Sequence, residues 1–206
     1  MTTVNLKALN GLESKLLEIN GLIIVQKMLF INNKLLPSNL SQLKKEIEKL
    51  LNESRDIIFP LVDYTFPNQV NLHILAENLI FYGNHLSRQN TQYNKTIWCE
   101  YIDIIRKNNP GSVFRKTANQ LRDFETRFVM FSRKYIDQKV DILQLEECVF
   151  SLGKEIFSLV ESIAVLKMMF TFIARKKLSC QNLLPVPAKT ARPELKLVAS
   201  DGRRLA

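Results

Sequence analysis

Two histidines, His73 and His85, and the nearby Glu77 are the residues of this 206-residue chain whose types most suggest a metal site. His73 and Glu77 are four residues apart and would share one face of a helix. His85 lies twelve residues after His73, about 120° further round a helix. A zinc site needs three or four protein ligands, and the Glu-x-x-His pairs of di-iron bundles are absent from the sequence. We therefore expect ordinary helix residues here, with no metal and no cofactor.

Catalytic signatures are also absent from the sequence. It contains no G-x-G-x-x-G, no G-x-x-x-x-G-K-[ST] and no G-x-S-x-G. Cys99 and Cys148 occur in helical apolar patterns, where cysteine usually behaves as a small hydrophobe. An enzyme with an unrecognised site stays open as a third alternative. The sequence favours a protein that is no enzyme and has no small-molecule substrate.

Basic side chains are the next candidates, because the chain carries a net charge of +9. In the segment 112–138 they form two stripes about 100° apart on a helix. The first stripe is Arg115, Arg122 and Arg133, and the second is Lys116, Arg127 and Lys134. A row of cations on a rigid element suits phosphate contacts, so nucleic-acid binding through this face is an alternative function. Asp123 and Asp137 interrupt the stripes, and a solvated helix face is the simpler interpretation.

The elements that carry these residues are predicted to be helices. Glycine is scarce, and apolar residues recur every three or four positions through most of the chain. We expect helices near 4–33, 38–59, 68–89, 94–107, 112–138 and 141–177, with a connector between Pro60 and Pro67. The first helix is expected to bend or break near Asn20 and Gly21. Its run 22–31 is apolar nearly all round, so we expect it to be buried.

The last helix has the strongest pattern in the chain. Its apolar seam follows a strict three–four alternation through Ile142, Leu145, Val149, Leu152, Ile156, Leu159, Ile163, Leu166, Phe170 and Ile173. The stretch 156–174 approaches the length of a membrane span, but Glu161 and Lys167 sit in its middle and favour a buried core helix. Apolar residues off the seam indicate further cover at this end. Met168, Met169 and Phe172 are therefore candidate partner contacts.

From residue 179 the composition changes. The segment 179–206 has three prolines, no aromatic residue and no helical stripe. We expect it to be an extended or disordered basic tail, following a helical domain of residues 1–178. Arg192, Arg203 and Arg204 are its candidate partner contacts, and the tail would assist the basic helix in the nucleic-acid alternative.

Together these patterns predict an all-α fold, a mainly antiparallel bundle of five to seven helices with a long C-terminal spine helix. Three widely separated cysteines without a C-x-x-C motif indicate a reducing, cytoplasmic compartment. The favoured function is a non-enzymatic helical interaction protein, a scaffold or adaptor. We expect a protein partner or a homo-oligomer and no membrane span.

Overall fold

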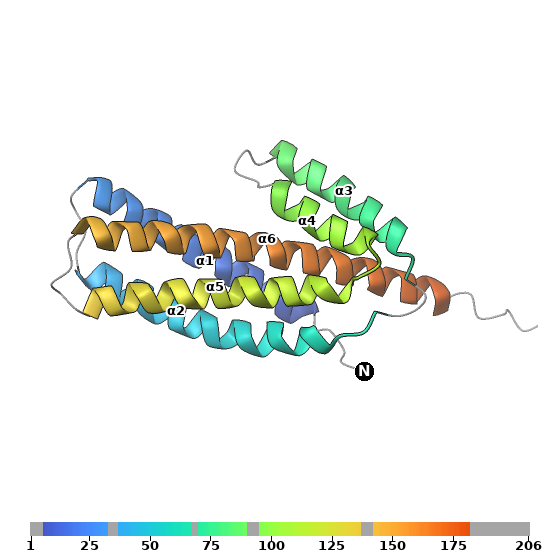
Figure 1. Ribbon diagram of the computed structural model, residues 1–206, viewed down its shortest axis with the longest axis horizontal. Coiled ribbons are helices and arrows are strands. Elements are labelled where there is room, and N and C mark those ends of the chain that lie inside the picture. The colour runs from blue at the N-terminus through green and yellow to red at the C-terminus, as the bar shows by residue number, and fades with distance from the viewer. Residues whose placement is uncertain (1–5, 33–36, 67–69, 90–94, 137–141, 182–206) are drawn as a thin grey trace, which may run out of the picture.

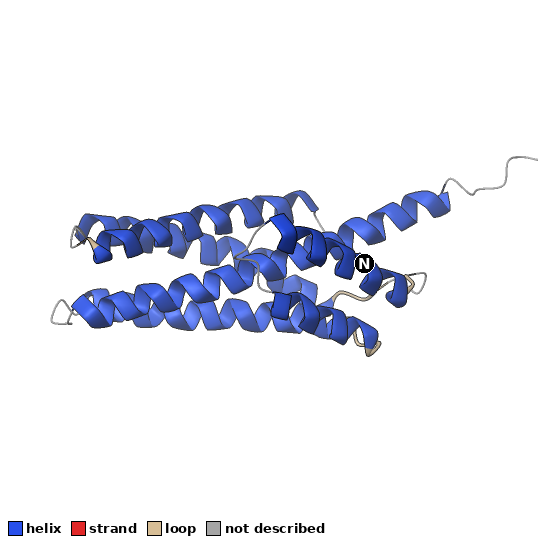
Figure 2. Ribbon diagram, turned by 90° about the horizontal axis from the view of Figure 1, so that it is seen from above, coloured by secondary structure: helices blue, strands red, loops and turns tan. Residues whose placement is uncertain are grey.

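The computed structural model describes residues 6–32, 37–66, 70–89, 95–136 and 142–181. Within these ranges the chain forms six α-helices, one 3-10 turn and no strand (Figures 1 and 2). The elements are α1 (Leu6–Ile31), α2 (Pro37–Ile58), η1 (Phe59–Asp63), α3 (Leu72–Gln89), α4 (Lys95–Arg106), α5 (Gly111–Ile136) and α6 (Ile142–Gln181). The predicted all-α fold is confirmed.

Successive helices run in opposite directions, so the bundle is antiparallel (Figure 1). α1, α2, α5 and α6 form a four-helix bundle in which α6 contacts α1 and α5, and α2 contacts the same two helices. α3 and α4 form a hairpin that packs on the C-terminal half of α6 (Figure 1). α6 therefore contacts every other helix except α2 and serves as the spine.

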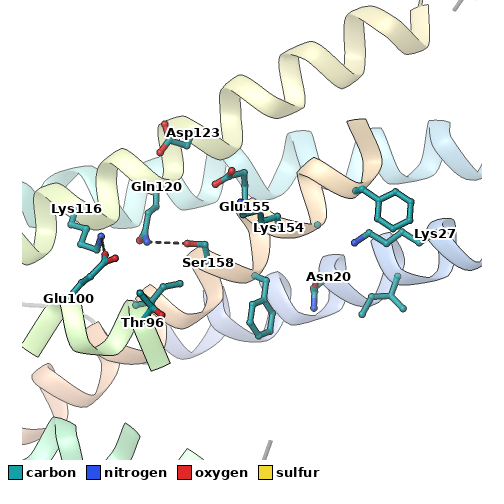
Figure 3. Close-up of a pocket in the computed structure, with 15 residues that line it drawn as sticks. Asn20, Lys27, Thr96, Glu100, Lys116, Gln120, Asp123, Lys154, Glu155 and Ser158 are labelled. Carbon is teal, nitrogen blue, oxygen red and sulfur yellow. Dashed lines mark hydrogen bonds and ion pairs between the residues drawn. The ribbon is translucent and has the colours of Figure 1, made fainter. Parts of the chain in front are cut away.

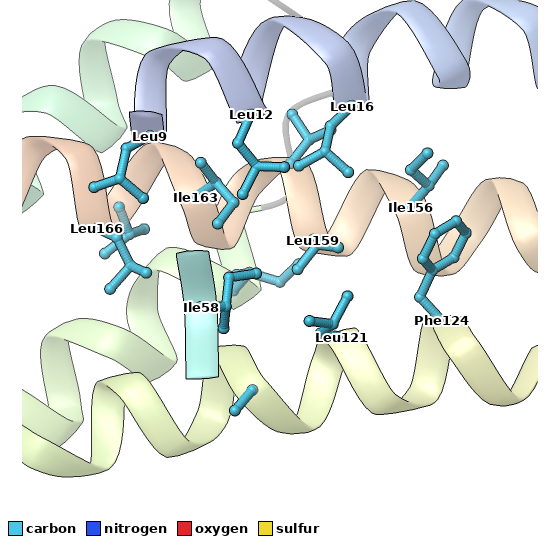
Figure 4. Packing of buried hydrophobic residues seen from close by; sticks show 14 of the residues in the cluster. Leu9, Leu12, Leu16, Ile58, Leu121, Phe124, Ile156, Leu159, Ile163 and Leu166 are labelled. Carbon is cyan, nitrogen blue, oxygen red and sulfur yellow. The ribbon is translucent and has the colours of Figure 1, made fainter. Parts of the chain in front are cut away.

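The seam of α6 forms the centre of the core, as predicted. Leu152, Ile156, Leu159, Ile163 and Leu166 are each 0% exposed. They meet a matching stripe on α1 from one side and the Phe-rich stripe on α5 from the other (Figure 4). Burial of each such side chain stabilises the fold by about 1.5–3 kcal/mol before ordering entropy is subtracted.

Local signals in the sequence explain several helix ends. Pro60 ends α2, because proline lacks the N–H that the next turn would need. The side chain of Asn71 accepts hydrogen bonds from the backbone N–H groups of His73 (3.0 Å) and Ile74 (3.2 Å), which caps the start of α3. Asn108 adopts φ 55° after α4, the left-handed conformation that terminates many helices.

The expected break in α1 and the expected burial of its run 22–31 are both wrong. The helix continues without a break through Asn20 and Gly21, because its buried stripe runs on both sides of them and holds the helix against α6. The run 22–31 is not buried all round: Ile24, Met28 and Ile31 are 46%, 55% and 64% exposed. α1 occupies a corner of the bundle, so no other described helix covers its outer side (Figure 1).

α6 also runs further than predicted, to Gln181 rather than Lys177, because no helix breaker precedes Pro185. The rest of the predicted tail, with Arg192, Arg203 and Arg204, lies outside the described residues. By length and composition the stretch Leu143–Arg175 of α6 could cross a membrane. Inside this protein 61% of its most apolar part is buried, which is the pattern of a core helix.

The packing predicts a contrast between two leucines of α6. Leu159→Ala should lower the free energy of unfolding by about 2 to 5 kcal/mol, because a cavity adds to the lost burial. Leu143 is 67% exposed on the same helix, so Leu143→Ala should change it by no more than about 0.5 kcal/mol. Urea denaturation of both variants measures the difference. Equal losses would contradict the placement of the seam.

Candidate functional site

The described structure brings no third metal-ligating side chain to His73 and Glu77. Both histidines lie exposed on α3, where His73 Nε2 is 3.6 Å from Glu77 Oε1 and these two side chains are 78% and 61% exposed. In the described part of the chain no group of three or more His, Cys, Asp or Glu side chains could hold a metal ion. Exposed side chains four residues apart on a helix are neighbours on its surface, which is sufficient to explain the contact between His73 and Glu77.

The outer face of α1 carries five of the eleven large apolar side chains that are exposed in the described structure. We define this outer face as Leu17, Ile24, Val25, Met28 and Ile31, whose exposed fractions lie between 46% and 64%. Single exposed apolar residues are normal on a soluble protein, but a contiguous patch often marks a binding surface. Between residues 20 and 31 every exposed position of α1 is apolar or glycine, and the nearest exposed charge is Glu18, beside Leu17. The feature was visible in the sequence as the apolar run, which was wrongly expected to be buried.

A groove of about 660 Å³ adjoins this outer face. Four helices line this groove (Figure 3). The lining includes Ile24 and Lys27 of α1, Glu100 of α4, Asp123 of α5 and Phe150 of α6. α4 closes one end of the groove, where Lys116 of α5 pairs with Glu100 (Figure 3). Because Ile24 and Phe150 both line the groove, it continues the apolar outer face onto α6.

The surroundings of Lys27 reduce the polarity that this charged residue brings to the groove. Its ammonium lies 4.7 Å from the ring centroid of Phe150, a cation–π contact. Partial burial lowers the pKa of Lys27, because the charged form loses hydration there. Beneath it, Gly153 brings α6 so close to α1 that an added Cβ would lie 3.0 Å from Cγ2 of Ile23.

A largely buried polar network borders the groove, with Gln120 and Ser158 in the groove lining, and no residue pattern in the sequence identifies it. The hydroxyl of Tyr101 lies 2.8 Å from Thr117 Oγ1 and donates to Gln120 Oε1 at 3.0 Å. The Gln120 amide donates to Ser158 at 3.2 Å, and Ser162 donates to the Gln120 carbonyl. These groups join α4, α5 and α6 and satisfy one another, so we assign the network to positioning helices. The only sequence signal was that Thr117 interrupts an apolar stripe.

The basic residues of α5 do not form one surface. Arg115, Arg122 and Arg133 are all exposed, so the first stripe exists, although Arg122 also lies over the ring of Phe59 at 5.7 Å. The second stripe is divided, because Lys116 pairs with Glu100 of α4. Its other members, Arg127 and Lys134, line a small pocket of about 270 Å³ together with Glu147 and Cys148 of α6.

The apolar residues near the end of α6 are covered largely within the chain. Met169 is 0% exposed, so it cannot contact a partner in this conformation. Met168 and Phe172 are half-buried and face α3, where they line a small cavity with Leu75 and Tyr82. The α3–α4 hairpin therefore covers much of the surface that the sequence predicts for a partner.

The polar network predicts a pH-dependent stability. Burial raises the pKa of Tyr101 to about 12 from an ordinary value of 10.0. The unfolded chain therefore loses this proton first, and stability should fall as pH rises from 10 toward 12. Tyr101→Phe should show a smaller fall over this range, with a loss of about 1 to 3 kcal/mol at neutral pH because partners are left unpaired. Urea titrations at several pH values would test this, and parallel pH profiles would contradict it.

The first basic stripe predicts only weak binding of nucleic acid. Binding of a 30-base-pair duplex should weaken steeply between low and physiological salt, because counterion release dominates contacts of this kind. Arg115→Ser, Arg122→Ser and Arg133→Ser together should abolish it while far-UV circular dichroism stays unchanged. Fluorescence anisotropy measures the affinity. Tight binding at physiological salt, lost in the triple variant, would make nucleic acid the preferred partner.

Searches against family models, curated proteins and solved structures give no match for this chain.

Proposed function

We propose that this chain is a non-enzymatic helical interaction protein, a scaffold or adaptor that docks a protein partner through the outer face of α1. One observation carries the proposal: five large apolar side chains, each about half exposed, lie on one helix, and between residues 20 and 31 every exposed position of this helix is apolar or glycine. A solvated helix face would be expected to carry charged and polar residues.

The energetics favour a protein partner for this face. Full burial of such a side chain contributes about 1.5–3 kcal/mol. A partner that buries the exposed half of one side chain would therefore gain roughly 1 kcal/mol. Five side chains then offer about 5 kcal/mol to a complex, a useful share of the free energy of micromolar binding, about 8 kcal/mol. Nucleic acid would gain little from the same face, because phosphates need cations.

The chemistry of the groove also supports a binding role rather than catalysis. The groove is lined by both lysines and carboxylates, and one of these lysines, Lys116, is paired with Glu100. The nearby hydroxyls of Ser158 and Thr117 belong to a satisfied, uncharged network. Neither histidine is in the groove lining, so the described residues place no imidazole base beside these hydroxyls.

Site-specific photo-crosslinking tests the proposal. A benzophenone side chain at Met28, in the centre of the outer face, should form a discrete covalent adduct with a protein in the native host. The same group at Phe81 is the matched control, because Phe81 is a large apolar residue on α3 that is 69% exposed and lies outside the outer face.

The expected adduct from position 28 survives nuclease and is lost on protease treatment, and it is at least tenfold stronger than any adduct from position 81. Equal labelling from both positions would show that α1 has no special role. An adduct that disappears with nuclease would favour the basic stripe of α5 instead.

A further inference from the structure

The outer face of α1 has the spacing of a second helix–helix seam. Leu17, Gly21, Ile24, Met28 and Ile31 follow one another at intervals of four, three, four and three residues, as in a coiled coil. The core stripe of the same helix runs through Leu12, Leu16, Ile19 and Ile23 and faces α6 and α2. α1 therefore has two apolar faces, as a helix with neighbours on two opposite sides would have. In the described chain only one of these faces is covered by other helices.

We infer that a second copy of this chain occupies the outer face, with the two α1 helices packed antiparallel about a twofold axis between Leu22 and Ile23. This inference rests on the proposed function, because it names the partner of that same surface. A twofold contact uses the same patch on both copies, so the patch must complement itself.

Side-chain sizes along the seam meet that requirement. In an antiparallel pair centred between Leu22 and Ile23, Leu17 lies opposite Met28 of the second copy, and Gly21 lies opposite Ile24. Each pairing occurs twice because of the symmetry. Nothing lies within 4 Å of the position where a Cβ would stand on Gly21, so Ile24 of the second copy has room to enter.

Glu13 and Lys27, two of the charges nearest the seam, are engaged on their own chain, and the third, Glu18, is exposed and lies level with Lys27 of the second copy in this pairing, a residue of opposite charge. Glu13 pairs with Lys167 of α6, and Lys27 is turned toward the ring of Phe150. The seam positions from Leu17 to Ile31 carry no charge. Two copies can therefore approach without bringing like charges into contact, which would oppose pairing.

The exposed area is sufficient for a reversible dimer. The five outer-face residues and Phe150, which is 40% exposed, are each about half exposed. With roughly 200 Å² for a large side chain they offer about 600 Å² per copy. Two copies would bury about 1,200 Å², the lower limit for specific interfaces. A dimer that dissociates on dilution is expected.

Disulfide trapping tests the pairing and its direction. The background carries Cys99→Ser and Cys180→Ser, so that the exposed Cys99 forms no unrelated link. Leu17→Cys and Met28→Cys proteins are oxidised separately and as an equimolar mixture. Equivalent residues of the two copies lie eleven positions apart along the pair, about 16 Å, beyond the reach of a disulfide. The mixture should therefore give about tenfold more covalent dimer than either protein alone.

Sedimentation of the full-length chain provides an independent measurement. The unmodified chain should shift from monomer to dimer with concentration, and Ile24→Glu should remain monomeric at every concentration used. Ile74→Glu is the control, because Ile74 is 40% exposed on α3 and should leave the dimer intact. Thermal unfolding of both variants verifies that they are folded.

Three results would overturn the inference. The first is that the unmodified chain stays monomeric, and the second is that Ile74→Glu loses the dimer as fully as Ile24→Glu. The third is that each single-cysteine protein on its own forms as much covalent dimer as the mixture. The proposed function fails in a different way. If the chain is monomeric and a benzophenone at Met28 still captures another protein, the outer face is a docking surface and only the second copy is excluded.

Discussion

The close contact between α1 and α6 is the constraint on which the rest of the structure depends. Gly153 lets the two helices approach until Ile23 and Lys27 lie directly over the α6 backbone. A Cβ at position 153 would lie 2.7 Å from the Lys27 ammonium and 3.0 Å from Cγ2 of Ile23, so the Lys27 side chain would have to swing aside and Ile23 would have to shift slightly. That contact fixes which side of α1 faces the core. It also fixes which side is left outside.

Interhelical ion pairs support this arrangement at the edges of the bundle. Lys167 of α6 pairs with Glu13 of α1, Lys15 of α1 pairs with Glu53 of α2, and Arg55 of α2 pairs with Glu125 of α5. Each pair joins neighbouring helices. Ion pairs at a protein surface usually contribute less than about 1 kcal/mol each, so we assign them to alignment rather than to stability.

The α3–α4 hairpin divides α6 into a covered half and an open half. Over the C-terminal half, Leu79 and Tyr82 of α3 lie against Met168 and Phe172. Over the N-terminal half no described helix takes the place of the hairpin, and the groove between α1 and α5 remains. The groove is thus a consequence of a hairpin too short to cover the whole spine helix, and it adjoins the outer face of α1, which is exposed because α1 lies at a corner of the bundle.

The sequence by itself determined the helices and the face that α6 buries. Helical periodicity is a local property, and the alternation from Val149 to Ile173 places its apolar residues on a single face of the helix. Every one of these seam residues is buried. Pro60 and the turn at Asn108 likewise act through their own backbone conformation. For this reason the fold class and most helix boundaries could be predicted without the structure.

Only the tertiary structure decided what covers each face. The run 22–31 of α1 is apolar on nearly all sides, so its periodicity could not show how many neighbours the helix has, and Met28 proved to be exposed. The network at Tyr101 joins residues 16 to 42 positions apart in the sequence, a distance at which no local pattern identifies a partner. Local residue spacing fixes which helix face can be buried, whereas the position of a helix in the bundle fixes which face is buried.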